Sequence, residues 1–271
     1  MDTTQYRRPK TLAEARAAFG ASENASFLSG GHTLLPAMKL RLASPSELID
    51  LGNIPELRGI SVNGRTLSIG AATTHADVAE SEIVRTNIPA LSGLAGSIGD
   101  RHVRHRGTIG GSISNNDPAA DYPAGALGLG ATLVTDRRCI LADDFFAGLY
   151  QTAREADEIV TRIEFPIPDI ASYAKFLSPA SRFSIAGVFI ARSGANVRVA
   201  VTGAGIDGVF RPTHLETALA KDFHSRALAS CVIDPDAMMS DQNGTREYRA
   251  NLVMVMARRA MENLGTISVF K

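Results

Sequence analysis

The sequence predicts an α+β fold in three parts. Apolar residues make up 45% of the 271 residues and charged residues 21%, proportions typical of a soluble globular protein with a real core. Strand-like and helix-like segments are mixed without the strict β-α-β alternation of a parallel α/β sheet. The pattern changes near Leu57, and Pro166 with Pro168 indicates a second boundary. We therefore expect parts spanning residues 1–56, 57–168 and 169–271.

The first part is expected to alternate helices with short strands. Thr11 followed by Glu14 has the form of a capping box that opens a helix. Pro36 stands near the first turn of a second helix, where its missing N–H costs little. The expected elements in chain order are a helix to residue 20, a strand at 25–28, a helix at 34–42 and a strand at 47–51.

The second and third parts are expected to contain more strands. Between a helix rich in Ala, Gly and Ser and the next strand, residues 99–123 are expected to form a long loop. Thr213 with Glu216 is another capping-box pattern. The expected strands are 66–69, 132–134, 158–165, 185–191 and 197–202, and the expected helices are 74–80, 89–98, 213–221 and an amphipathic one at 246–264.

Charge and cysteine content exclude several classes of function. Lys plus Arg equals Asp plus Glu at 28 each, so no net field attracts nucleic acid or a membrane surface. Two distant cysteines, Cys139 and Cys231, supply neither a disulfide framework nor the four thiolates of an iron–sulfur cluster, so such a cluster must lie on another chain. No apolar run approaches the ~18 residues that span a bilayer, and no export signal is evident at the start. We expect a cytoplasmic protein.

A pair of glycines lies between a predicted strand and a predicted helix, in the segment Ser29, Gly30, Gly31, His32 and Thr33. Adjacent glycines let the backbone approach a ligand closely, and a helix start offers unpaired N–H groups and a positive dipole end. The arrangement suits a phosphate, with the Thr33 hydroxyl as a further donor. Taken alone, Gly-Gly also fits a plain tight turn.

A second segment repeats this chemistry: Thr108, Ile109, Gly110, Gly111 and Ser112. Two such loops predict a grip on both phosphates of one dinucleotide. Two carboxylates just downstream, Asp117 and Asp121, are suited to accept from ribose or adenine donors. A lysine-bearing phosphate loop is absent from the sequence, so phosphoryl transfer is not indicated.

Residues 29–45 (SGGHTLLPAMKLRLASP) and 98–123 (IGDRHVRHRGTIGGSISNNDPAADYP) resemble the FAD-binding medium subunit of the molybdenum hydroxylases. That group includes the xanthine dehydrogenase and carbon monoxide dehydrogenase families. The C-terminal segment 247–264 (EYRANLVMVMARRAMENL) is similar to the last helix of that family, so the resemblance covers nearly the whole chain.

The resemblance implies a two-part FAD-binding fold of the vanillyl-alcohol oxidase type, followed by a small C-terminal α+β domain. It implies that residues 29–33 and 108–112 wrap the pyrophosphate and ribitol, with Asp121 as a further contact. It also implies backbone contacts from Ile159 and Val160 near the flavin, and a contact from Lys175 in the C-terminal domain. Phe183 is at the position of an aromatic residue that stacks on the isoalloxazine, worth roughly 1 kcal/mol; a core aromatic is the alternative.

Three further features have simpler explanations. The segment 203–208 matches G-x-G-x-x-G, but Pro212 separates it from the next helix, so a glycine-rich connection is favoured over a dinucleotide fold. His102 and His105 are spaced like metal ligands, yet the arginines of the 101–106 cluster would repel a cation, and no metal site is predicted. Three interpretations of that cluster stay open: a solvated face, a positive charge that neutralises the FAD diphosphate, or a surface for an acidic partner.

These inferences predict an electron-transfer subunit with no catalytic side chain of its own. A large partner chain with a molybdenum cofactor would oxidise the substrate, a small chain with 2Fe-2S clusters would relay electrons, and FAD here would pass them to an external acceptor. The alternatives are a stand-alone FAD-dependent reductase or oxidase and a non-catalytic nucleotide-binding assembly protein. The substrate, the acceptor and the symmetry of the complex are not encoded in this chain.

Overall fold

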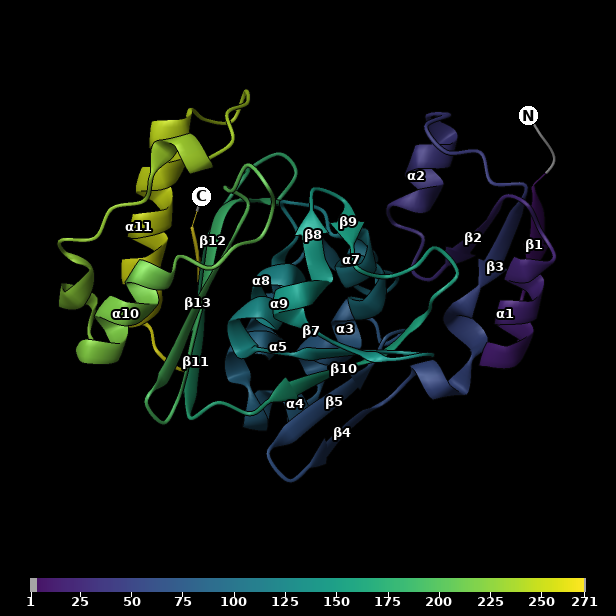
Figure 1. Cartoon of the computed structure of the whole chain (residues 1–271), viewed down its shortest axis with the longest axis horizontal. Helices are drawn as coiled ribbons and strands as arrows, with labels where there is room; N and C mark the ends of the chain where they lie inside the picture. The colour runs from purple at the N-terminus through teal and green to yellow at the C-terminus, as the bar shows by residue number, and fades with distance from the viewer. Residues whose placement is uncertain (1–3, 271) are drawn as a thin grey trace.

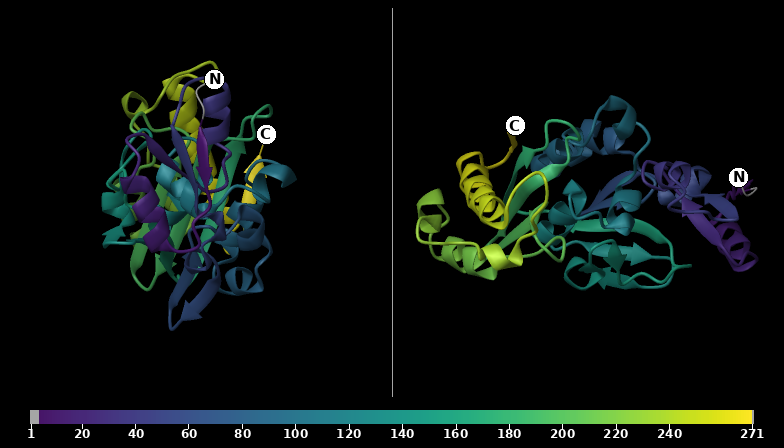
Figure 2. Two further views of the ribbon diagram at one scale, coloured as in Figure 1. Left: turned by 90° about the vertical axis from the view of Figure 1, so that its right-hand side faces the viewer. Right: turned by 90° about the horizontal axis from the view of Figure 1, so that it is seen from above.

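The computed structural model describes residues 4–270, which form an elongated molecule built from three successive parts (Figure 1). The N-terminal segment lies at one end of the long axis and the C-terminal helices lie at the other, as the right-hand view of Figure 2 also shows. Helices and strands are mixed throughout, which confirms the predicted α+β class.

The N-terminal part is a parallel sheet of three short strands in the order β1-β3-β2. The Thr11 hydroxyl accepts the N–H of Glu14 at 3.2 Å, but the Glu14 carboxylate takes the N–H of Lys10, so only half of the expected capping box forms. The second helix ends before the predicted residue 42 because Arg41 adopts a left-handed φ of 60°, which a right-handed helix cannot continue. The elements are β1 (Gln5–Arg7), α1 (Leu12–Gly20), β2 (Ala25–Leu28), α2 (Leu34–Lys39) and β3 (Glu47–Asp50).

The middle part is an antiparallel five-stranded sheet in the order β4-β5-β10-β6-β7, with helices and one small hairpin, β8–β9, beside it. Its strands are β4 (Ile60–Asn63), β5 (Thr66–Gly70), β6 (Thr132–Thr135), β7 (Cys139–Leu141), β8 (Phe146–Gly148), β9 (Gln151–Thr152) and β10 (Val160–Pro166). Its helices are α3 (His75–Glu80), α4 (Glu82–Asn87), α5 (Pro89–Gly96), α6 (Arg101–Arg104), α7 (Ile109–Asn115), α8 (Asp121–Leu129) and α9 (Ala142–Phe145).

The prediction of one long loop at 99–123 is wrong, because α6, α7 and the start of α8 lie within it. The side chains of Asp100 and Thr108 cap α6 and α7, so polar residues that suggested a loop instead start helices. Glycine in this segment serves close packing: a Cβ on Gly107 would lie 2.5 Å from the His75 ring. Glycine content alone therefore misled the prediction of this segment.

The C-terminal part is a four-stranded sheet in the order β13-β12-β11-β14, sandwiched between helices (Figure 1). Helices α10 and α11 pack on one side, while α5 and α8 of the middle part also contact this sheet. Strand β12 is accordingly apolar along most of its length. The elements are β11 (Ile170–Leu177), β12 (Ser184–Ser193), β13 (Asn196–Thr202), α10 (Thr213–Lys221), α11 (Arg246–Glu262) and β14 (Ile267–Phe270).

Two details of this part answer the sequence predictions. Helix α10 begins as predicted, but Pro212 is its N-cap, and Glu216 instead accepts the N–H of Val199 and pairs with Arg211, so the capping box is wrong. No helix starts within residues 203–208, which confirms the glycine-rich connection. Met254, Met256 and Met261 are buried in the core.

Buried apolar residues form three clusters, the smallest around α1 and β3, a large one in the middle part and another in the C-terminal part. The smallest cluster includes Ala72 and Ile159, which come from the middle of the chain. The exact domain boundaries stay a prediction. The N-terminal part and the middle part therefore share one apolar cluster.

Candidate functional site

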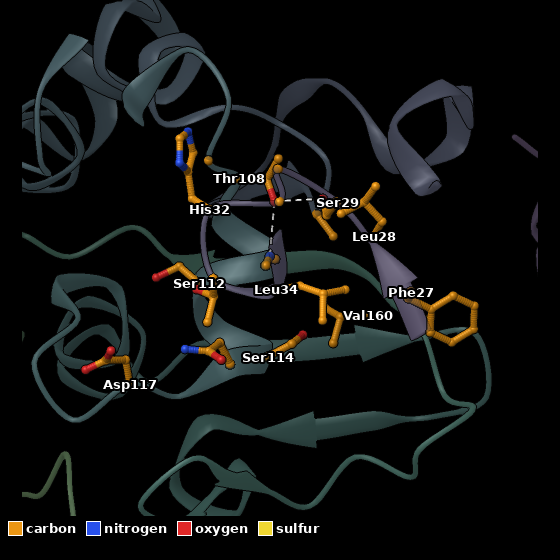
Figure 3. A pocket seen from close by; sticks show the side chains of 18 of the residues that line it. Phe27, Leu28, Ser29, His32, Leu34, Thr108, Ser112, Ser114, Asp117 and Val160 are labelled. Atoms are coloured by element: carbon orange, nitrogen blue, oxygen red, sulfur yellow. Dashed lines mark hydrogen bonds between the residues drawn. The ribbon is translucent and has the colours of Figure 1, made fainter. Parts of the chain in front are cut away.

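A cavity of about 770 Å³ lies where the 29–33 segment faces α7, within the range of ~300–1,000 Å³ that ligand pockets occupy. Figure 3 shows Ser29, His32 and Thr108 along one side of it, with Phe27 and Asp117 toward opposite ends. Most of the predicted site residues line this cavity: Ser29, Gly30, Gly31, His32, Thr33, Thr108, Gly110, Gly111, Ser112, Asp121, Ile159, Val160 and Phe183. Ile109 and Lys175 do not line it.

The first glycine segment is held against the loop that precedes α7. A Cβ on Gly30 would lie 2.3 Å from the carbonyl oxygen of Arg106, so only glycine permits this approach. Gly31 has φ +76°, in the left-handed region that glycine adopts without strain. The backbone N–H groups of residues 30–33 donate to no oxygen of the described residues. This segment therefore offers a row of unsatisfied donors at the cavity, as the sequence predicted.

The second segment differs from the first in its donors. The N–H of Ile109 donates to Thr73 O at 3.1 Å and that of Gly110 to Ala71 O at 2.9 Å. The N–H of Gly111 donates to the Thr108 hydroxyl at 3.1 Å (Figure 3). The expectation that this loop repeats the free backbone donors of the first is thus wrong, since the protein itself satisfies them.

The second segment forms one wall of the cavity and is hydrogen-bonded to the first segment. The Thr108 hydroxyl lies 2.8 Å from the Ser29 hydroxyl and so ties the two segments together across 79 residues (Figure 3). A Cβ on Gly110 would lie 2.5 Å from the Ala71 Cβ, so that glycine serves packing against the end of β5. Ile109 is fully buried in the core behind α7. Gly111 and Ser112 face the cavity.

Asp121 is the centre of a buried polar cluster at the start of α8. Its carboxylate accepts from Lys175 Nζ at 3.0 and 3.1 Å and from the Ser184 and Tyr173 hydroxyls. Lys175 is 0% exposed and donates also to Ser97 O at 3.2 Å. Burial, together with the charge of Asp121, raises the pKa of Tyr173, which keeps it a neutral donor. Lys175 therefore acts on the cavity through Asp121, which lines it.

The two ends of the cavity differ in exposure. One end, which we call the closed end, is lined by Phe27, Leu51, Leu57 and Ile159, and the last three are buried. The other, the open end, is lined by Ile98, Gly99, Arg182 and Phe183. The Phe183 side chain is 50% exposed, which removes the core-aromatic alternative for it.

The backbone groups of Ile159 are already hydrogen-bonded within the chain, so their contact with a cofactor stays a prediction. Its N–H donates to the Asp136 carboxylate at 2.9 Å, and its C=O accepts the N–H of Asp136 at 2.9 Å. Its side chain joins the N-terminal core cluster, at the closed end. Val160 follows as the first residue of β10 and lies near Phe27 in Figure 3. Both residues can form a wall of the cavity with their side chains.

His75 lines the cavity as a neutral side chain. It is 5% exposed and lies against the Tyr122 ring at 5.3 Å between centroids. Burial lowers the pKa of His75 to about 4, and the positive charges of His32 and Arg104 act in the same direction. His75 is therefore uncharged at neutral pH and supplies no cation for a phosphate.

Sequence reasoning did not single out several residues of this cavity, among them Phe27, Ile98 and Arg154. Phe27 is in the strand that leads into the glycine segment, and this position beside the predicted loop was a usable signal. Arg154 lies in a turn that no pattern marked. Among residues 4–270 there is no cluster of potential metal ligands, and none of the helices formed by them has the length and apolar character needed to cross a bilayer.

Comparisons with known proteins agree with this geometry. A family model described as the FAD binding domain in molybdopterin dehydrogenase matches residues 2–168. The carbon monoxide dehydrogenase medium chain of Hydrogenophaga pseudoflava is 36% identical, covering 95% of both chains, and the nicotine 6-hydroxylase medium subunit of Paenarthrobacter nicotinovorans is 33% identical, covering 96% of this chain and 97% of that one. A chain of the reconstituted CO dehydrogenase from Oligotropha carboxidovorans superimposes with a TM-score of 0.86 at 32% identity, covering 96% of each chain.

Proposed function

The chain belongs to the family of FAD-binding domains of molybdopterin dehydrogenases, and we propose from this that it binds FAD and carries electrons as the medium subunit of a molybdenum hydroxylase complex. The observation that carries the proposal is the row of free N–H groups at residues 30–33. Residues 30–33 line a cavity whose other wall is α7. Main-chain donors of this kind suit a diphosphate.

The described residues fit FAD. The close approach at Gly30 and the small residues Gly111 and Ser112 leave room for a diphosphate beside the free donors. We propose that residues 29–33 bind the phosphates, with the Ser112 hydroxyl opposite them. Asp121 then accepts from a hydroxyl of the ribose or ribitol, and Lys175 holds the Asp121 carboxylate in place.

The proposed orientation of the dinucleotide follows from the two ends of the cavity. FAD, when bound, supplies the electron-transfer chemistry, and the protein supplies position and environment. A redox ring must come within reach of a partner, so the isoalloxazine belongs at the open end beside the half-exposed Phe183. The adenosine half then belongs at the closed end, which is apolar and shielded from water.

No side chain of the cavity is proposed as a general acid or base. His75 is buried with a lowered pKa, and the Asp121 carboxylate is held by the Lys175 ammonium and by the hydroxyls of Tyr173 and Ser184. The substrate is therefore proposed to react on a larger partner chain with a molybdenum cofactor, and 2Fe-2S clusters of a smaller chain to relay the electrons. The external acceptor is proposed to take them from the open end, and the proposed location is the cytoplasm.

Purification of the protein from its native cells tests the proposal. We expect a yellow complex in which this chain carries one flavin and copurifies with a larger molybdenum-containing chain and a smaller iron–sulfur chain. Addition of the substrate should bleach the flavin band only when all three chains are present. A colourless chain would favour a nucleotide-binding assembly protein, and a yellow chain that is active alone would favour a stand-alone reductase or oxidase.

A further inference from the structure

Arg154 is a cavity-lining cation that the proposed function has not used. It lies in the turn between β9 and β10 and is half-buried. Its Nη1 donates to three main-chain carbonyls, those of Glu155 at 2.7 Å, Ala156 at 3.1 Å and Glu158 at 2.8 Å. One edge of the guanidinium group is thus fixed to the turn, and its plane is held in one orientation.

The rest of the guanidinium group has no partner among the described residues. Its Nε is buried without a hydrogen bond, and Nη2 donates to no described oxygen. The nearby carboxylates belong to other arginines: Asp157 pairs with Arg137, and Glu158 pairs with Arg138 at 3.0 Å. Burial lowers the pKa of Arg154 although these acids lie near it. A desolvated arginine without its own counter-ion is costly unless a ligand compensates it.

The position of Arg154 indicates which ligand group it meets. Ala156, Ile159 and Val160 continue the same stretch of cavity wall, and Ile159 joins the apolar cluster of the closed end. A flat aromatic base in an apolar pocket is a good partner for a fixed, planar guanidinium group, through cation–π contact and hydrogen bonds to ring nitrogens. Phe27 lines the same end and supplies a second aromatic surface.

We infer that Arg154 binds the adenosine half of the dinucleotide and thereby selects FAD over flavins that lack it. This inference rests on the proposed function, since it requires that the cavity hold FAD. It adds a binding residue outside both glycine segments. It also assigns to the 154–160 stretch a role in cofactor selection.

The test compares three probes on the flavin-free full-length chain: FAD, ADP and FMN. FMN shares the isoalloxazine and one phosphate with FAD but lacks adenosine. Arg154→Met should weaken binding of FAD and of ADP about tenfold, which corresponds to about 1.4 kcal/mol, and leave the FMN dissociation constant unchanged. Arg154→Lys keeps the charge but loses the planar fork, so it should recover only part of the loss.

Arg137→Met is the matched control, because Arg137 lies near the same turn but does not line the cavity. It should change none of the three dissociation constants. Equal weakening of FAD, ADP and FMN by Arg154→Met would mean that the variant merely loosens the turn, and unchanged binding of FAD would mean that Arg154 makes no contact; either result overturns the inference. If the wild-type chain binds none of the probes, the proposed function itself fails.

Discussion

The two similar glycine motifs contain glycines that the structure requires for different reasons. The three residues concerned are Gly30, Gly110 and Gly111. Gly30 allows two main chains to touch, since its Cβ would overlap Arg106 O. Gly110 allows α7 to pack on Ala71. Gly111 lines the cavity, and a Cβ on it would lie 2.9 Å from the Thr108 hydroxyl. That hydroxyl also joins the two segments through its contact with Ser29. The same residue type therefore predicts different consequences on mutation.

Gly111→Val should abolish flavin retention with little loss of folded protein. The branched side chain would occupy the space between Thr108 and Ser29 and push into the cavity, whereas the helical state of α7 is not disfavoured, since valine has a higher helix propensity than glycine. The measurement is the ratio of flavin absorbance to protein after purification, with circular dichroism as the check on folding. Gly20→Val, at a position with nothing within 4 Å, is the control and should keep its flavin. Full flavin content in Gly111→Val would contradict our placement of the diphosphate.

His75 should make stability depend on pH. The pKa of His75 is about 4 in the folded chain and ~6.5 when unfolded, so the unfolded state binds more protons between these values, and stability falls as pH falls through that window. The contribution lost between pH 7.5 and pH 5 is about 2 kcal/mol. Urea unfolding at the two pH values should show a smaller difference for His75→Leu than for the wild type. His102→Leu, on the exposed face of α6, should leave the difference unchanged.

At the scale of secondary-structure elements, the Asp121–Lys175 pair joins parts of the fold that no short-range pattern connects. It links the start of α8 to β11, and through Ser97 and Ser184 it reaches the end of α5 and the start of β12. Both charges are buried, so each depends on the other. The position of Asp121 at the cavity is thus set by the C-terminal sheet.

Removing one partner of this pair should lower the stability of the fold strongly. Lys175→Met leaves the Asp121 carboxylate buried without its cation and should lower the free energy of unfolding by about 3–5 kcal/mol. Asp121→Asn alone should also destabilise, but the double variant should lose at least about 1 kcal/mol less than the sum of the two. Urea unfolding of the four proteins gives this coupling directly. Strict additivity would show that the two groups do not interact in solution.

The sequence predicted most of the longer elements because their periodicity and end signals were local. The strands at 185–191 and 197–202 and the helix at 213–221 lie where they were expected. The segment 99–123 was missed because Gly, Asp and Asn are typical of loops, whereas the packing role of its glycines depends on distant partners such as His75. Lys175 pairs with Asp121, 54 residues away, and Arg154 Nε has no partner among the described residues. Both features depend on tertiary structure and could not be predicted from local sequence. The motif resemblance therefore predicted which segments line the cavity, but it did not predict the different roles of their residues.

At the scale of the whole molecule, the cavity lies between parts that we expect to differ in local stability. The three strands of the N-terminal sheet pair only with one another within residues 4–270, and the apolar cluster behind them is the smallest of the three. The four-stranded C-terminal sheet has helices packed against it and a large cluster of its own. Local opening follows the regions with fewest buried contacts, so the N-terminal part should open first. The 29–33 segment, which lines the cavity, belongs to that part.

Binding of FAD should therefore stabilise the molecule unevenly. A ligand that contacts residues 29–33 and α7 together adds its binding energy to the closed arrangement only, which lowers the population of local openings of the N-terminal sheet. Hydrogen exchange followed by mass spectrometry should show β2 and β3 protected at least about tenfold more with FAD than without it, while β12 and β13 exchange at the same rate in both states. The Gly111→Val chain with added FAD is the control and should exchange like the flavin-free wild type. Equal protection of both sheets would mean that the N-terminal part opens only with global unfolding, and that the cavity is not closed by the ligand.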